Sequence, residues 1–189
     1  DLDLSPLPPP PSAITAACTT KTVALLVAHV YGARVDMQPL IEAARSRGLV
    51  VVEDCAEAWS GSQGYRGCDQ SDVVMFSFGP IKYSTAFQGG IMRCRDAKLL
   101  QRMRQVHSQW PVQSKLTYLI RCVRFTAYVL LQRPVVLGAI MWFLKLLGFD
   151  HQKFFVWLIR SFSSTSCNSA YLRRLRVQPS APLLTALTR

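Results

Sequence analysis

The sequence predicts an α/β fold built on a mostly parallel sheet with flanking helices. Four short apolar runs of strand length recur in its first half: Thr22–Ala28, Leu49–Glu53, Asp72–Phe78 and Gly90–Cys94. Continuous β-branched runs of this kind are typical of strands that are buried on both faces. Because a helical pattern separates the first two runs and another follows the last, we expect a sheet whose interior strands are covered by helices on both sides.

Three helices are expected beside these strands. The proline run Pro8–Pro11 predicts an extended, polyproline-like loop, and a short helix follows it around Ser12–Thr19. A second helix begins after Asp36, which we predict to be its N-cap, and ends at Gly48, a residue typical of helix C-termini. A third helix, Asp96–His107, closes the unit.

The composition changes after Trp110-Pro111. The stretches Tyr118–Leu131 and Pro134–Gly148 are strongly apolar, but arginines and a lysine interrupt them. No window reaches the roughly 18–20 uninterrupted apolar residues of a membrane-spanning helix. Three alternatives stay open: helices packed in a protein, helices lying in a membrane interface, and a true span. We therefore divide the chain into residues 1–110, a helical region at 111–176, and a tail at 177–189.

Positive charge is concentrated in the second half of the chain. The net charge is +11, yet residues 1–97 carry eight Lys/Arg against ten Asp/Glu, whereas residues 98–189 carry fourteen against one acid, Asp150. An anionic partner is therefore expected in the second half. The basic residues alternate with long aliphatic runs and form no polar basic stripe, which disfavours nucleic acid and leaves an anionic membrane surface as a candidate partner.

The six cysteines are scattered, with no CxxC pair and no ligand spacing to the three histidines. They predict free thiols in a reducing compartment and no metal site. The first residue is Asp1 and not Met, so we expect a processed, truncated or partial chain. No basic-then-apolar leader is present at the start, so no signal peptide is expected, and we predict a cytoplasmic location with membrane association left open.

Four motifs in register carry the chemistry of the first half. They are His29–Gly32 (HVYG), Val51–Ala58 (VVEDCAEA), Phe76–Lys82 (FSFGPIK) and the pair Gly89-Gly90. In order and spacing this set resembles the DegT/DnrJ/StrS family of pyridoxal-phosphate (PLP) dependent, fold-type-I sugar aminotransferases, over about residues 13–107. The resemblance implies that residues 1–110 are part of a PLP-transferase large domain. It also implies transfer of an amino group from an amino acid, expected to be glutamate, to a nucleotide-linked keto-sugar.

The resemblance implies a role for each of five residues. Lys82 would be the catalytic lysine that holds the cofactor aldehyde as an imine, and Asp54 would pair with the pyridine nitrogen. Ser77 would hydrogen-bond the phosphate, Ala56 would lie against the ring, and Glu57 would lie near the phenolic oxygen. The residues alone also allow simpler roles, since an acid after a strand can be a helix N-cap and a strand-end serine can be an ordinary hydroxyl.

Two positions depart from the family pattern. Glu57 stands where relatives more often have Gln or His, and a carboxylate there would repel a phenolate unless one of them is protonated. Phe87-Gln88 replaces the Gly-acidic pair that usually precedes Gly89-Gly90. We interpret His29 and Tyr31 as packing residues and Gly64–Gly67 as a structural turn.

Family members are considerably longer, with an upstream phosphate-binding turn and a downstream small domain. This chain is therefore expected to be a fragment, inactive by itself if those parts are missing. The resemblance further implies nucleotide-sugar and amino-acid substrates and a homodimer at full length. The alternative hypothesis is a non-catalytic membrane-surface protein, in which the aminotransferase-like half is a scaffold and residues 112–176 bind anionic lipid.

Overall fold

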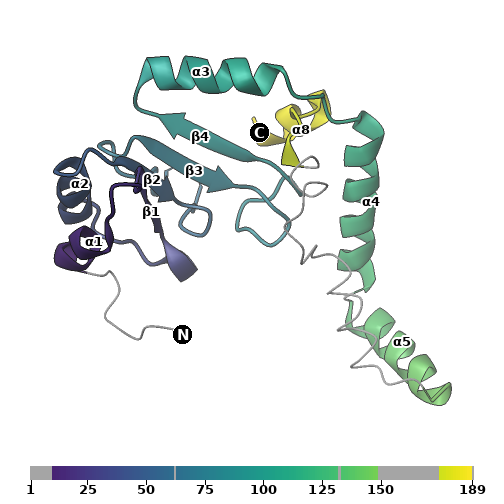
Figure 1. The fold of residues 1–189 in the computed structure, drawn as a ribbon. Helices are drawn as coiled ribbons and strands as arrows, with labels where there is room; N and C mark the ends of the chain where they lie inside the picture. Colours follow the sequence, from purple (N-terminus) through teal and green to yellow (C-terminus); the bar gives the residue numbers. More distant parts are fainter. Residues whose placement is uncertain (1–9, 62, 132, 149–174, 189) are drawn as a thin grey trace. The chain divides into compact units, whose positions relative to one another are not determined.

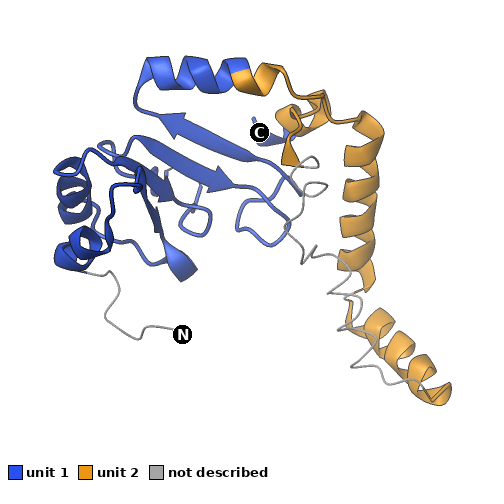
Figure 2. Cartoon of the chain, in the orientation of Figure 1, with its two compact units in different colours: residues 1–105, 186–189 blue, residues 106–185 orange. Residues whose placement is uncertain are grey.

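The computed structural model describes residues 10–61, 63–131, 133–148 and 175–188. Of the proline run that predicts an extended loop, Pro8 and Pro9 lie outside the described residues, Pro10 is extended, and Pro11 is the first residue of a helix. The chain forms two compact units, one of residues 1–105 with 186–189 and one of residues 106–185 (Figure 2). Each unit is described by itself.

The first unit is built on a four-stranded sheet (Figure 1). Its strands are β1 (Ala24–Ala28), β2 (Val50–Asp54), β3 (Val73–Ser77) and β4 (Gly90–Cys94), and they lie side by side in that order. The first two pairings are parallel and the last is antiparallel. The predicted mostly parallel sheet is therefore confirmed. Because β1, β2 and β3 run the same way, their carboxyl ends meet at one edge of the sheet.

Two helices, α1 (Pro11–Ala17) and α2 (Gln38–Arg45), bury one face of this sheet. Both were expected from the sequence. The core between the helices and the sheet consists of the buried side chains of Ile14, Met37, Leu40, Ile41, Ala44, Leu49 and Val51. Burial of such side chains contributes roughly 1.5–3 kcal/mol each, so this cluster holds the first unit together.

Helix α2 begins one residue later than predicted. Met37, not Asp36, occupies the N-cap position, so the prediction of Asp36 as the N-cap is wrong. The Asp36 carboxylate nevertheless accepts a hydrogen bond from the Gln38 N–H at 3.1 Å, because a short acidic side chain can satisfy a free N–H of the first turn from either position. The predicted stop at Gly48 is confirmed: its φ is +67°, and its N–H donates to Arg45 O at 3.0 Å.

The opposite face of the sheet is largely open. Leu26, Val50 and Met92 are 61%, 42% and 51% exposed. Helix α3 (Ala97–Ser108) reaches this face at one point, where Met103 Sδ lies 3.6 Å from Cys94 Sγ. The prediction that helices cover both faces is therefore wrong for the described residues. An apolar strand sequence shows that both faces of the strand are apolar, but it does not show which segment packs on each face.

The second unit contains the helices α4 (Lys115–Leu131) and α5 (Pro134–Leu146), and the short helix α8 (Ala181–Leu187) begins in it. The first two confirm the apolar stretches as helical. Among the described residues, neither helix alone has the length and apolar character needed to cross a bilayer. The two meet that test only as a pair, with an 82° bend at the break between them.

The loop after Lys82 has an unusual backbone. Phe87 has a φ of +62°, in the left-handed region that favours glycine, and its N–H donates to Thr85 Oγ1 at 2.9 Å. Phe87 and Gln88 stand where the family that this sequence resembles usually has a glycine followed by an acidic residue. At Gly90, a Cβ atom would lie 2.6 Å from Phe76 O, so only glycine allows the two strands to approach this closely.

We predict that Phe87→Gly is more stable than Phe87→Ala by about 1 kcal/mol. Both variants lose the phenyl ring, but only alanine keeps the cost of a Cβ atom in the left-handed conformation. The free energy of unfolding, measured by urea denaturation, checks this difference. Equal stabilities, or a more stable alanine variant, would show that residue 87 does not adopt a positive φ.

Candidate functional site

The candidate site lies at the carboxyl ends of the three parallel strands. The ladder continues for one residue beyond the strands themselves: the His29 N–H donates to Asp54 O at 3.0 Å, and the Cys55 N–H donates to Met75 O at 2.8 Å. The loops that follow β1, β2 and β3 therefore start from the same edge. Ligands bind at this edge in open α/β sheets.

Strand alternation places Asp54 and Ser77 on the same face of the sheet. Asp54 is paired with Met75, and Ser77 lies two residues further along β3. Since side chains alternate between the two faces with a period of two, Asp54, Met75 and Ser77 point the same way. Both predicted polar residues are the last residues of their strands, as expected.

Four of the five predicted site residues line one hollow of about 240 Å³. The residues around it are Tyr31, Gly32, Ala56, Glu57, Trp59, Ser77, Ile81, Lys82, Tyr83 and Ser84. Asp54 is not among them. Its Oδ1 instead accepts a hydrogen bond from the Ala56 N–H at 2.9 Å, so it holds the loop that carries Ala56 and Glu57. No helix follows Asp54 among the described residues before β3, so this bond closes a local turn and is not the helix N-cap that the residues alone also allowed.

A tight turn after β3 brings Lys82 back beside Ser77. The Lys82 N–H donates to Gly79 O at 3.1 Å. A Cβ atom at Gly79 would lie 3.7 Å from Ser77 Oγ and 4.0 Å from Lys82 Cγ, so hydroxyl and lysine stem flank the same small residue. The Lys82 side chain is only 19% exposed, which distinguishes it from a freely solvated surface lysine.

Glu57 connects Lys82 to the loop after β1. Its Oε1 lies 3.7 Å from Lys82 Nζ, and its Oε2 accepts a hydrogen bond from the Tyr31 N–H at 2.8 Å. Tyr31 has a φ of +54°, a conformation that a non-glycine residue adopts only where its surroundings hold it. Tyr31 is 94% exposed, so its interpretation as a packing residue is wrong. The carboxylate therefore pairs with the lysine ammonium and also fixes the backbone at the rim of the hollow.

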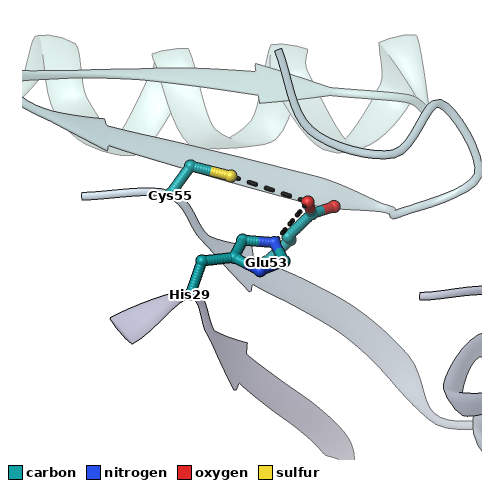
Figure 3. A group of neighbouring side chains, drawn as sticks. All are labelled: His29, Glu53 and Cys55. Carbon is teal, nitrogen blue, oxygen red and sulfur yellow. Dashed lines mark hydrogen bonds and ion pairs between the residues drawn. The ribbon is translucent and has the colours of Figure 1, made fainter. Parts of the chain in front are cut away.

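A buried polar network lies on the other face of β2 (Figure 3). Glu53 is completely buried, and its carboxylate accepts hydrogen bonds from His29 Nε2 at 2.8 Å, Tyr65 Oη at 2.6 Å, Ser71 Oγ at 2.6 Å and the Cys68 N–H at 2.9 Å. Burial raises the pKa of Glu53, but the bonds from Ser71, Tyr65, His29 and Cys68 outweigh it and hold the pKa below its usual value. The carboxylate is therefore ionised at neutral pH.

His29, Glu53 and Cys55 lie close enough together to suggest a metal site, because their possible ligand atoms are within 4.8 Å of one another. The hydrogen bonds argue against one. The Val35 N–H donates to His29 Nδ1 at 3.0 Å, so Nδ1 is an acceptor and the ring proton is on Nε2, where it is donated to Glu53. Burial raises the pKa of Cys55 to about 12, which leaves the thiol protonated. The three side chains are therefore held by hydrogen bonds within the protein, which agrees with the interpretation of His29 as a packing residue.

The Gly64–Gly67 turn completes this network. Gly67 has a φ of +79°, and a Cβ atom there would lie 2.4 Å from Val74 Cγ1. The turn presents Tyr65 to Glu53, and the Arg34 guanidinium lies 5.1 Å from the centre of the Tyr65 ring. These contacts support the interpretation of the segment as structural.

Comparison with known proteins identifies the family. The model of the DegT/DnrJ/EryC1/StrS aminotransferase family matches residues 1–118. Protein MosB of Rhizobium meliloti is 38% identical over 99 residues, 51% of this chain and 19% of MosB. GDP-perosamine synthase of Caulobacter vibrioides is 35% identical over 97 residues, 51% of this chain and 26% of that enzyme. The structure of DesI with its TDP-sugar product aligns with 31% identity and a TM-score of 0.47, over 52% of this chain and 25% of DesI.

The chain belongs to the DegT/DnrJ/EryC1/StrS aminotransferase family, because the family model covers more than half of its residues. The resemblance seen in the four motifs is thereby confirmed. The chain spans only about a fifth to a quarter of the length of the relatives named above. The match ends where the apolar, basic helices begin.

Two features of the site were missed by sequence reasoning. The first is the set of residues around Glu53. Its members are spread along the sequence in no recognisable spacing: His29, Cys55, Tyr65, Cys68 and Ser71. One signal was available, since Glu53 is an acid inside an otherwise apolar strand run, and such an acid requires buried partners. The second feature is the ion pair between Lys82 and Glu57, which depends on how two loops turn.

We predict that Glu53→Gln lowers the free energy of unfolding by about 3 kcal/mol. An amide can accept from only part of the donor set, and its NH₂ group faces buried donors, so several polar atoms lose their partner. The control is Glu42→Gln on the exposed face of α2, which should change stability by less than about 0.5 kcal/mol. Equal effects in urea denaturation would contradict the buried network.

We also predict that protonation of Glu53 lowers the stability of the fold at acid pH. Its pKa is lower in the folded chain than the unfolded value of 4.5, so its contribution to stability is complete above that value. The contribution is lost as the pH falls below 4.5 towards the folded pKa. Stability measured between pH 7 and 3 should therefore fall more steeply for the wild type than for Glu53→Gln. Parallel curves would contradict this assignment.

Proposed function

We propose that this chain is the cofactor-binding part of a PLP-dependent aminotransferase that acts on a nucleotide-linked keto-sugar. The observation that carries the proposal is the convergence of Lys82, Ser77, Ala56 and Glu57 on one hollow at the carboxyl ends of parallel strands. These four residues come from two separate motifs, Val51–Ala58 and Phe76–Lys82, and the lysine is largely withdrawn from solvent. Membership of the aminotransferase family supports the same reaction class.

The residues present fit the cofactor. Ser77 offers a hydroxyl donor for a phosphate oxygen, and Lys82 offers an amine for the aldehyde carbon. Gly32 and Ala56 are small and leave room for a flat ring against the loop backbone. Asp54 shares the face of Ser77 and would hold the proton of the pyridine nitrogen, although part of its carboxylate is engaged by the Ala56 N–H. When bound, PLP supplies an electron sink for the bonds at the amino-acid Cα.

Lys82 is also the base of the proposed reaction. Its Nζ, once it no longer holds the cofactor, is the group placed to take a proton from the amino-acid Cα and to return it to the acceptor. Glu57 faces this amine directly, since its Oε1 lies 3.7 Å from the Lys82 Nζ. The carboxylate would also repel an anionic phenolic oxygen of the cofactor, so it opposes cofactor binding unless it is protonated.

The substrates are proposed from the relatives. Relatives include synthases of GDP-perosamine and a transaminase named for a dTDP-linked amino sugar. We propose a nucleotide-linked keto-sugar as acceptor, an amino acid, expected to be glutamate, as donor, and a cytoplasmic reaction, where both substrate classes are found. We also propose a homodimer for the complete protein. Tyr31, Ile81 and Tyr83 at the rim of the hollow are 83–94% exposed, and a second subunit would cover them.

The test is covalent capture of the cofactor. The purified chain is incubated with PLP, reduced with borohydride, digested and mapped by mass spectrometry. We expect the phosphopyridoxyl mass on the peptide that contains Lys82, and its loss in Lys82→Ala. The matched control is Lys98→Ala, an exposed lysine of α3, which should keep the label on Lys82. Labelling spread over other lysines, or none at saturating PLP, would contradict the proposal for this chain.

A second prediction concerns Glu57. Replacement by Gln, the residue that relatives more often carry, removes the charge that competes for Lys82 and repels the phenolic oxygen. The Glu57 side chain is 43% exposed, so solvent screens these effects, and we expect PLP affinity to rise by only about two- to fivefold. A titration followed by absorbance measures the affinity. Weaker binding by Glu57→Gln would show that the carboxylate supports the cofactor instead of opposing it.

A further inference from the structure

A short bridge joins the two ends of the helical region within the second unit. Val112 and Gln178 form a parallel bridge, in which the Gln178 N–H donates to Pro111 O at 2.8 Å and the Gln113 N–H donates to Gln178 O at 2.9 Å. The Gln178 side-chain amide also donates to Trp110 O at 2.5 Å and Ser108 O at 3.2 Å. The segment of residues 113–177 therefore starts and ends at the same bridge, where its two ends are hydrogen-bonded to each other. The family match ends inside it, at residue 118.

Helix α4 exposes a continuous apolar stripe. Leu116, Leu119, Ile120, Val123 and Leu130 are each at least 50% exposed. At about 100° per residue they lie within about 60° of a single line along the helix. On the opposite side Tyr118 is buried and Phe125 is half-buried, whereas Val129 near the end of the helix is exposed. A helix with one packed side and one exposed apolar side has a second surface to cover.

Helix α5 repeats the pattern. Val135, Trp142, Phe143 and Leu146 are 84%, 66%, 54% and 66% exposed, at the helical spacing i, i+7, i+8 and i+11. An exposed tryptophan beside an exposed phenylalanine is unusual for a water-facing helix, whereas these residues favour the boundary between lipid and water. The apolar surface is therefore not confined to one helix.

The charges around these stripes have one sign. Residues 98–189 hold fourteen Lys/Arg and one acid. Lys115 and Arg124 lie roughly 90° to either side of the α4 stripe, Lys145 lies in α5 and Arg133 lies between the two helices, whereas Arg121 lies on the opposite side of α4. Long basic side chains can extend along apolar surface while their charged ends stay in water or among phosphates. At a protein–protein interface, in contrast, lysine is depleted, although arginine is not.

We infer that the exposed stripes of α4 and α5 bind the surface of an anionic lipid bilayer. The apolar side chains would enter the boundary between headgroups and acyl chains, and the basic side chains would contact lipid phosphates. The helices would lie in the interface and not cross the bilayer. Such attachment would hold the aminotransferase-like body at a membrane, and it needs neither the cofactor nor catalysis.

The test is flotation of the full chain with vesicles of phosphatidylcholine alone and of phosphatidylcholine with phosphatidylserine, each at low and high salt. We expect binding to the anionic vesicles at low salt, weakening as salt screens the phosphates, and little binding to the neutral vesicles. Absence of binding to anionic vesicles, or equal binding to both kinds, would overturn the inference. Retention on anionic vesicles after an alkaline carbonate wash would overturn the interfacial geometry.

A matched pair of variants locates the surface. Val123 and Val129 lie on the same helix and are 61% and 58% exposed, but only Val123 belongs to the stripe, since Val129 points about 120° away from it. Val123→Glu and Val129→Glu change the net charge equally. We expect Val123→Glu to weaken binding by about tenfold, the factor that corresponds to burying a valine, and Val129→Glu by less than about threefold. Equal losses would overturn the assigned stripe.

This experiment is independent of the proposed catalytic role. Vesicle binding is measured without PLP, and covalent capture by Lys82 is measured without lipid. Failure of flotation would remove the membrane surface and leave the PLP site untouched. Flotation without cofactor capture would instead favour the alternative hypothesis, in which the aminotransferase-like half is a scaffold.

Discussion

The first unit depends on one buried carboxylate. Glu53 has no solvent contact, so its charge is tolerated only because four donors from separate segments converge on it. These donors tie the end of β1, the Tyr65 turn and the entry to β3 to the middle strand. Because side chains alternate along β2, anchoring Glu53 on one face turns Asp54 towards the other, where Ser77 also points. The same contacts therefore stabilise the fold and orient the site.

The two faces of the sheet have different roles. One is packed against α1 and α2, whereas the other carries Asp54 and Ser77 and leaves Leu26 and Met92 exposed. The chain corresponds to only about a quarter of most relatives named above. The proposed cofactor hollow, small and formed from three loops, is consistent with a chain that carries the lysine half of a binding site. Its chemistry in a complete protein would depend on the surfaces that cover this face.

Glu57 sets the electrostatics of the hollow. Its carboxylate pairs with the Lys82 amine at 3.7 Å and also holds the Tyr31 backbone. The strained residues Tyr31 and Phe87 lie on the loops around this pair.

The sequence by itself determined the strands, their mostly parallel order, the helices and the family, because apolar periodicity and the four motifs are local and ordered along the chain. It also placed Asp54 and Ser77 at strand ends. Only the tertiary structure decided that His29, Tyr65 and Ser71 surround Glu53, that Lys82 pairs with Glu57, and that the described helices cover only one face of the sheet. These features join residues distant in sequence, and their positions follow from loop geometry and the packing of side chains, which local patterns do not encode.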